Sequence, residues 1–135
     1  MSDFWDTNVF VYAFLCGPKQ QIARRRLASG GIISVQVLNE FANVMARKMR
    51  QPWADVERFL SVIRVRFPTV APLTIQTHAA ALALARDHSI AFCDALIVAS
   101  ALSAGCARLF TEDMQHRRRF GDCVVVNPFL EETPK

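Results

Sequence analysis

The sequence lacks the short motifs of several enzyme classes. It has no Gly-x-Gly-x-x-Gly segment and no phosphate-binding loop ending in Gly-Lys-Ser or Gly-Lys-Thr. It has no Gly-x-Ser-x-Gly turn, so no serine is marked as a nucleophile. The three histidines (His78, His88 and His116) lack the spacing of metal ligands, and we expect His78 and His88 to be structural or solvated. These absences argue against dinucleotide binding, P-loop chemistry, serine hydrolysis and histidine-based metal sites.

Long apolar runs and closely paired cysteines are missing as well. No hydrophobic stretch reaches the roughly 20 residues of a transmembrane helix. The apolar segment from Val9 to Leu15 is short and has no basic leader, so it does not resemble a secretory signal. The four cysteines, two of which (Cys93 and Cys106) have apolar neighbours in the sequence, form no Cys-x-x-Cys pair. We therefore expect a cytoplasmic protein with free thiols and no membrane association.

What is present is a chain of 135 residues, 52% of them hydrophobic, which suits one domain with one core. We expect residues 1–130 to form this domain and residues 131–135 to be a flexible tail. The net charge is +4, and arginine carries most of the excess. A basic surface attracts polyanions, although each run can equally be a plain solvated face. The basic runs are Arg24–Arg26, Arg47–Arg50, Arg64–Arg66 and Arg117–Arg119.

Short apolar strands alternate with helical patterns along the whole chain. We predict strands at 3–6, 32–33, 69–71, 108–110 and 124–126. We predict helices at 9–14, 19–28, 35–48, 53–65, 75–88 and 95–104, with 90–93 as a link before the last of them. We also expect Trp5 and Trp53 to be packing residues. The alternation predicts a single α/β domain, with a central, mostly parallel β-sheet flanked by helices on both faces.

Two aspartates stand where such a fold places its chemistry. Asp6 ends the first predicted strand, and sites in open α/β sheets lie outside the carboxyl ends of the strands. Asp6 can alternatively be the N-cap of the helix that follows. Asp94 is the only charged residue between His88 and Arg108, at the mouth of an apolar helix. Such a carboxylate must cap the helix, be paired or bind a cation.

Three further acids are candidates with open alternatives. Glu40 lies on the flank of the apolar face of its helix, and can instead be a rim residue paired with Arg47. Glu112 and Asp113 follow a predicted strand and Thr111, which could orient a carboxylate or a water. The alternative for these two acids is an ordinary polar loop.

Taken together, the acids predict a cation site. Carboxylates held close together repel, and their pKa values rise unless a cation neutralises them. Ligand sets made only of oxygen suit Mg²⁺ or Mn²⁺, which activate water and stabilise charge on a phosphate. With the basic surface, this pattern favours a nucleic-acid hydrolase.

Four segments resemble the motifs of PIN-domain ribonucleases, and most closely those of VapC-type toxins from toxin–antitoxin pairs. The segments are residues 4–9, 34–41, 94–101 and 109–114. The resemblance implies a parallel sheet flanked by helices, and RNA cleavage that depends on Mg²⁺ or Mn²⁺. It also implies a homodimer, and inhibition by a small antitoxin protein bound over the acidic site.

The resemblance also implies roles for individual residues. Asp6, Glu40, Asp94 and Asp113 would be the catalytic acids, with Asp6, Asp94 and Asp113 as the metal ligands. The supporting residues would be Asn8, Thr111 and Glu112, and Glu112 is also the alternative to Asp113 as fourth acid. The run His116–Arg119 is either an RNA contact or a surface loop.

Two other functions are weighed against this one. The first is a catalytically weak PIN-like module that binds RNA or protein. The second is a phosphatase with Asp6 as covalent nucleophile, which is disfavoured because the second aspartate of such enzymes is replaced here by Asn8. The helix at 53–65 is amphipathic, and its apolar side is a candidate dimer surface.

Overall fold

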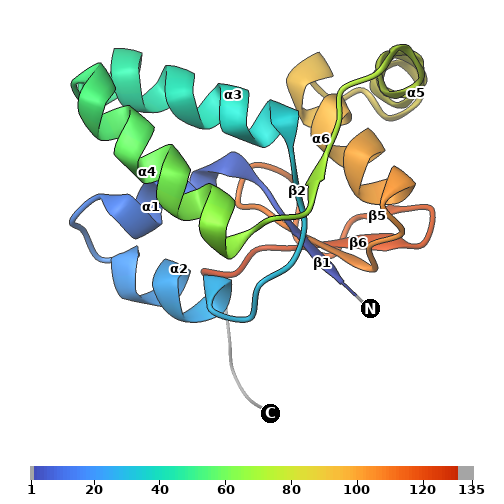
Figure 1. Ribbon diagram of the computed structural model, residues 1–135. Coiled ribbons are helices and arrows are strands. Elements are labelled where there is room, and N and C mark those ends of the chain that lie inside the picture. The colour runs from blue at the N-terminus through green and yellow to red at the C-terminus, as the bar shows by residue number, and fades with distance from the viewer. Residues whose placement is uncertain (1, 131–135) are drawn as a thin grey trace.

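A computed structural model describes residues 2–130, so the predicted tail at 131–135 lies outside the described residues. Its main sheet has the order β1-β4-β6-β5, formed by Asp3–Trp5, Arg108–Phe110, Cys123–Val126 and Arg119–Phe120. Figure 1 shows β1, β5 and β6 of this sheet. β1, β4 and β6 are parallel neighbours, and β5 pairs antiparallel with β6. β2 (Ile33–Ser34) and β3 (Val70–Ala71) form a second parallel pair, and a bridge between Phe4 and Ile32 connects it to β1. The predicted α/β domain with a mostly parallel sheet is confirmed.

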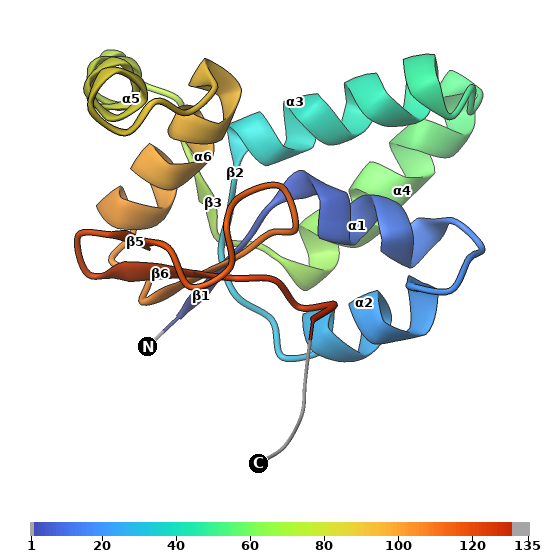
Figure 2. The same ribbon diagram turned by 180° about the vertical axis from the view of Figure 1, so that it is seen from behind.

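The helices lie in two groups. Figures 1 and 2 show α1 to α4 together on one side of the molecule, and α5 and α6 side by side on the other, with the strands between them. A π-helical segment, η1, continues α3. The helices are α1 (Thr7–Phe14), α2 (Gln20–Leu27), α3 (Val35–Asn43), η1 (Val44–Lys48), α4 (Trp53–Arg66), α5 (Ile75–His88) and α6 (Phe92–Ser103). No helix within residues 2–130 combines the length and apolar character needed to cross a membrane.

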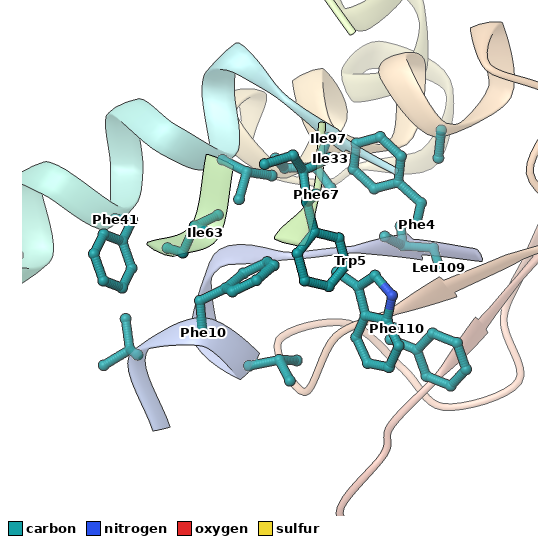
Figure 3. Packing of buried hydrophobic residues seen from close by; sticks show 14 of the residues in the cluster. Phe4, Trp5, Phe10, Ile33, Phe41, Ile63, Phe67, Ile97, Leu109 and Phe110 are labelled. Carbon is teal, nitrogen blue, oxygen red and sulfur yellow. The ribbon is translucent and has the colours of Figure 1, made fainter. Parts of the chain in front are cut away.

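Aromatic side chains fix the strands that carry the site. Trp5 is 1% exposed, and its ring stacks on that of Phe110 with centroids 4.2 Å apart. Phe10 packs edge-to-face on Phe67 at 5.1 Å (Figure 3). Such aromatic pairs add to the burial energy of the rings. Because Trp5 and Phe110 are the last residues of β1 and β4, their stacking holds the two strand ends side by side.

The structure corrects several sequence predictions. Trp53 is 64% exposed, because it begins α4, whose buried residues are Val56 and Ile63. The segment 90–93 is not only a link, since α6 already begins at Phe92. Cys93 is exposed at this helix start rather than packed among apolar residues. The strand β5 was not predicted, because it is two residues long and lies in a run of arginines.

Candidate functional site

The site begins at the carboxyl ends of two neighbouring parallel strands. Asp6 directly follows β1, and Thr111 directly follows β4. The backbone N–H of Asp6 donates to the carbonyl of Phe110 at 2.9 Å, so the strand pairing continues up to the first acid. The parallel pairing therefore brings together two residues that are 105 positions apart in the chain.

Asp6 is a buried acid at the end of β1 and also the N-cap of α1, so the N-cap alternative is confirmed and its role in chemistry stays a prediction. Its side chain is the N-cap of α1 and accepts from the backbone N–H of Thr7 at 2.6 Å. Its Oδ2 accepts from the hydroxyl of Thr111 at 2.8 Å. The residue is only 2% exposed. A carboxylate that is buried, with a hydrogen bond to each oxygen, is poorly placed to be a covalent nucleophile, which argues against the phosphatase hypothesis.

Burial raises the pKa of Asp6 from its ordinary value of 3.8 to about 7. The hydrogen bonds from Thr111 and from the backbone of Thr7 oppose this rise, because they stabilise the charged form. The negative charges of Glu40 and Asp113 add to it. Glu40 and Asp113 thus lie close enough to Asp6 for their charges to act on it.

Glu40 reaches the site from α3. One of its oxygens accepts from the Thr7 hydroxyl at 3.1 Å, and the other accepts from the Gln36 side chain at 2.8 Å. The Thr7 hydroxyl also lies 3.5 Å from the carbonyl of Val37. The partners of Glu40 are therefore Thr7 and Gln36, and the expected pairing with Arg47 is wrong. The sequence analysis assigned no role to Thr7 or Gln36. Thr7 stands between two predicted site residues, Asp6 and Asn8.

The loop after β4 lies beside α1 (Figure 2) and is held there by Asn8 and Thr111. The Asn8 amide donates to the Thr111 hydroxyl at 3.1 Å and to Asp113 Oδ2 at 3.0 Å. The backbone N–H of Asp113 donates to the same hydroxyl at 3.1 Å. Thr111 thus connects Asp6, Asn8 and Asp113 in one hydrogen-bond network.

Glu112 is engaged on the other side of this loop. Its carboxylate accepts from the Tyr12 hydroxyl and forms an ion pair with Lys19 at 2.6 Å. The Lys19 ammonium also lies over the rings of Tyr12 and Phe129. Because Glu112 is already neutralised, Asp113 is the better candidate for the fourth acid of the cluster.

Asp94 joins the cluster from the first turn of α6. The N-cap of α6 is Ala91, so the alternative in which Asp94 caps this helix is wrong. Burial raises the pKa of Asp94, and the charges of Asp113 and Glu40 raise it further. Asp94 and Asp6 thus both lie within the electrostatic influence of Glu40 and Asp113.

The four acids supply oxygen ligands only, the type that hard divalent cations prefer. The four ion pairs among residues 2–130 use other acids, so Asp6, Glu40, Asp94 and Asp113 have no basic partner in this part of the chain. Within the same range, no group of three or more His, Cys, Asp or Glu side chains is arranged as a ready-formed ion site. The observed cluster is therefore a set of mutually repelling carboxylates, and such a set is stabilised when a cation neutralises it.

The run His116–Arg119 is partly structural. His116 accepts from the backbone N–H of Asn127 at 2.9 Å, and Arg118 donates to the carbonyl of His88 at 2.8 Å. Arg117 and Arg119 are exposed. The loop-anchoring role of His116 and Arg118 could not be read from the sequence, because their partners lie in other segments.

Comparison with known families identifies the class. The family model described as PIN domain matches residues 4–120, which contain all four acids. The chain therefore belongs to the PIN domain family, a family of nucleases. The predicted resemblance is thus confirmed at the level of the family.

Solved structures resemble this fold along most of the chain. A toxin–antitoxin complex from Klebsiella pneumoniae matches with a TM-score of 0.71 and 22% identity, covering 95% of this chain and 98% of that one. VapC20 from Mycobacterium tuberculosis, described as a sarcin–ricin loop cleaving toxin, matches with a TM-score of 0.70 and 20% identity, covering 83% and 92%. VapBC2 from Rickettsia felis, bound to a DNA fragment from its promoter, matches with 0.69 and 19%, covering 93% and 97%. The comparison with curated proteins gave no significant match.

Proposed function

We propose that this protein is an endoribonuclease that depends on Mg²⁺ or Mn²⁺ and is the toxin of a type II toxin–antitoxin pair. The observation that carries the proposal is the hydrogen-bond network of the buried Asp6. The Thr111 hydroxyl donates to Asp6 and accepts from the backbone N–H of Asp113. The charges of Glu40 and Asp113 act on both Asp6 and Asp94. Membership of a nuclease family supports hydrolysis of a phosphodiester as the reaction.

The proposed roles follow from the contacts of each side chain. Asp6, Asp94 and Asp113 hold the ion, and Glu40 completes the site or orients the water that attacks. A bound divalent ion supplies a lowered pKa for water and positive charge for the reacting phosphate. Asn8 and Thr111 position the carboxylates by hydrogen bonds, as the sequence interpretation expected of polar supports. Glu112 is assigned to holding the loop through Tyr12 and Lys19 rather than to the reaction.

RNA is the proposed substrate. The net charge of +4 favours association with a polyanion, and exposed arginines such as Arg117 and Arg119 lie near the end of the described chain. One structural relative is described as a toxin that cleaves the sarcin–ricin loop, which is an RNA element. Mapping the ends of the cleavage products identifies the target RNA.

Two protein partners belong to the proposal. Two of the structural relatives, those from Klebsiella pneumoniae and Rickettsia felis, are toxin–antitoxin complexes, which supports a cognate antitoxin that covers the acidic site. A second copy of the chain is proposed for an exposed apolar surface on α5, where Ile75 is 76% and Leu82 is 53% exposed. Light scattering of Leu82→Glu on α5 and of Val65→Glu on α4, the helix that the sequence suggested as a dimer surface, tests the homodimer and its interface. Loss of the dimer only in Val65→Glu would show that the interface lies on α4 instead of α5.

The nuclease proposal is tested by cleavage of RNA by the purified protein. We expect cleavage with Mn²⁺ or Mg²⁺, none with EDTA, and losses of at least about 100-fold in Asp6→Asn and Asp94→Asn. Asp122→Asn, which changes an exposed aspartate outside the cluster, is the matched control. Full activity in both site variants would refute the proposal. Tight RNA binding without calorimetric ion binding would favour the catalytically weak binding module.

A further inference from the structure

A cavity of about 240 Å³ lies next to the acid cluster and is not used by the proposed reaction. It shares Asn8 and Asp113 with the cluster on one side. Its other walls contain Val11 of α1, Val44 and Lys48 of η1, and Met49, which follows η1. The cavity therefore extends from the acids towards a surface that is apolar and carries one cation.

The cation-bearing wall has an unusual backbone. Val44–Lys48 is π-helical, and the N–H of Met49 donates to the carbonyl of Val44 at 3.0 Å. Single π-helical turns are rare and occur frequently at functional sites. Val44, Lys48 and Met49 line the cavity and Arg47 does not, although Arg47 and Lys48 are both exposed. Of the two adjacent basic residues of the π-helical turn, Lys48 is thus the one at the cavity.

The charges of the walls differ from one side to the other. Asp113 contributes negative charge next to the acid cluster. The other acid in the lining, Glu112, is neutralised by its ion pair with Lys19. Lys48 forms no ion pair within residues 2–130. A ligand for this cavity should therefore carry one negative group near Lys48 and an apolar group near Val44 and Met49.

A nucleotide has this combination, with a phosphate attached through the sugar to a base that has apolar faces. The volume is below the range of roughly 300–1,000 Å³ that is typical of drug-sized ligands, which fits one nucleotide rather than several. Bases are accessible to such a cavity in single-stranded RNA, whereas in an RNA duplex they are stacked and paired. The occupant is thus one unit of an unpaired RNA strand.

We propose that this cavity is a subsite for one nucleotide of single-stranded RNA, adjacent to the phosphodiester that is cut. Lys48 binds the phosphate of that nucleotide, and Val44 and Met49 contact its base. The inference rests on the proposed nuclease function and adds to it a determinant of which RNA sequences are cut.

Binding of a short, fluorescently labelled single-stranded RNA in EDTA tests the subsite without any cleavage. We expect Lys48→Gln to weaken binding about 3- to 10-fold, and to lower the slope of log affinity against log salt by about 0.7, the value for one phosphate contact on a single strand. Arg47→Gln removes the same charge from the neighbouring position, outside the cavity, and we expect less than half of this effect. Equal losses in the two variants, or no loss in Lys48→Gln, would overturn the subsite.

A second variant fills the cavity instead of removing charge. We expect Val44→Phe to weaken binding of the same RNA and, with Mn²⁺, to change the base preference beside the cleaved bond. Val65→Phe on the exposed face of α4 is the control, and thermal unfolding checks that both proteins fold. Unchanged affinity and base preference in a folded Val44→Phe protein would refute the base contact, as would equally effective competition by duplex RNA.

These outcomes separate the subsite from the nuclease proposal. An inactive wild-type protein whose RNA binding depends on Lys48 would contradict the nuclease function and keep the subsite. A metal-dependent nuclease in which Lys48 has no specific effect would keep the function and contradict the subsite.

Discussion

Replacing Asp6 by asparagine should stabilise the metal-free protein at neutral and alkaline pH. The pKa of Asp6 is about 7 in the folded protein and 3.8 in an ordinary environment. Between these values the folded state binds the proton more tightly than the unfolded state does. Folding stability therefore falls as pH rises from about 4 to about 7, and it levels off above that range.

The difference in pKa sets the magnitude. At about 1.4 kcal/mol per pH unit, a difference of about three units corresponds to about 4 kcal/mol. We expect about 2 to 4 kcal/mol, because the interior relaxes and water enters around a charged carboxylate. The asparagine Oδ1 can still accept from the backbone N–H of Thr7, so the helix cap is retained. The asparagine Nδ2 cannot accept from the Thr111 hydroxyl as Oδ2 of Asp6 does, so this hydrogen bond is lost at every pH. The stability of Asp6→Asn relative to the wild type should therefore rise by about 2 to 4 kcal/mol between pH 4 and pH 8, and exceed that of the wild type at pH 8.

The assay is urea unfolding in EDTA at several pH values between 4 and 8. The fluorescence of Trp5 is suitable because its ring is buried against Phe110, whereas Trp53 is exposed in the folded protein. The quantity that matters is the difference in unfolding free energy between wild type and variant, in which the other titrating groups largely cancel. Asp122→Asn, at an exposed position, should show no such pH-dependent gain. A difference that stays constant from pH 4 to pH 8 would refute the assignment of a raised pKa to Asp6.

Three further predictions concern the backbone, the core and the loop. Gly31→Ala should cost at least about 3 kcal/mol of unfolding free energy, because its Cβ would clash with the Asp3 carbonyl oxygen and lie 2.8 Å from the Trp5 indole nitrogen. The φ of residue 31, 141°, adds strain for any residue with a Cβ. Gly30→Ala should cost only about 1 kcal/mol, because its Cβ meets open space; equal costs in urea unfolding would contradict the clash. Ser100→Ala should stabilise by about 1 kcal/mol, because the buried hydroxyl has no hydrogen-bond partner among the described residues, and a loss in the same assay would reveal a partner. In RNA cleavage, Asp113→Asn should lose at least about 10-fold and Glu112→Gln much less, and the reverse order would exchange their roles.

The part of the site at the strand ends could be predicted from the sequence. Asp6 and Thr111 each follow a short apolar strand, and the two strands are parallel neighbours. The carboxyl ends of parallel neighbours meet at the same edge of a sheet, so local sequence and fold class were sufficient to bring these residues together. The same reasoning brought Glu112 and Asp113 into the vicinity, but it could not choose between them.

The choice between Glu112 and Asp113 depends on residues that are distant in sequence. Glu112 is bound by Tyr12 and Lys19, and Asp113 is bound by Asn8. These partners are about 100 positions away, on α1 and just before α2, and no pattern of hydrophobic spacing indicates which side chain each will meet. The exposed position of Trp53 was missed for a related reason. Its side chain lies at a helix start, where helical periodicity does not fix the direction of a residue.

Burial and mutual repulsion of the carboxylates weaken the metal-free fold, and the same two features would favour binding of a cation. Asp6 and Asp94 are at least partly buried, and each has its pKa raised by the charges of Glu40 and Asp113. A well-packed core around Trp5 and the hydrogen bonds of Thr111 keep these charges close in spite of their repulsion. When a divalent cation binds only the folded state, it relieves this repulsion and stabilises the fold by mass action. The proposed cation would relieve the same repulsion that acts on Asp6 in the metal-free protein, so Asp6→Asn should raise the stability of the metal-free protein and weaken cation binding.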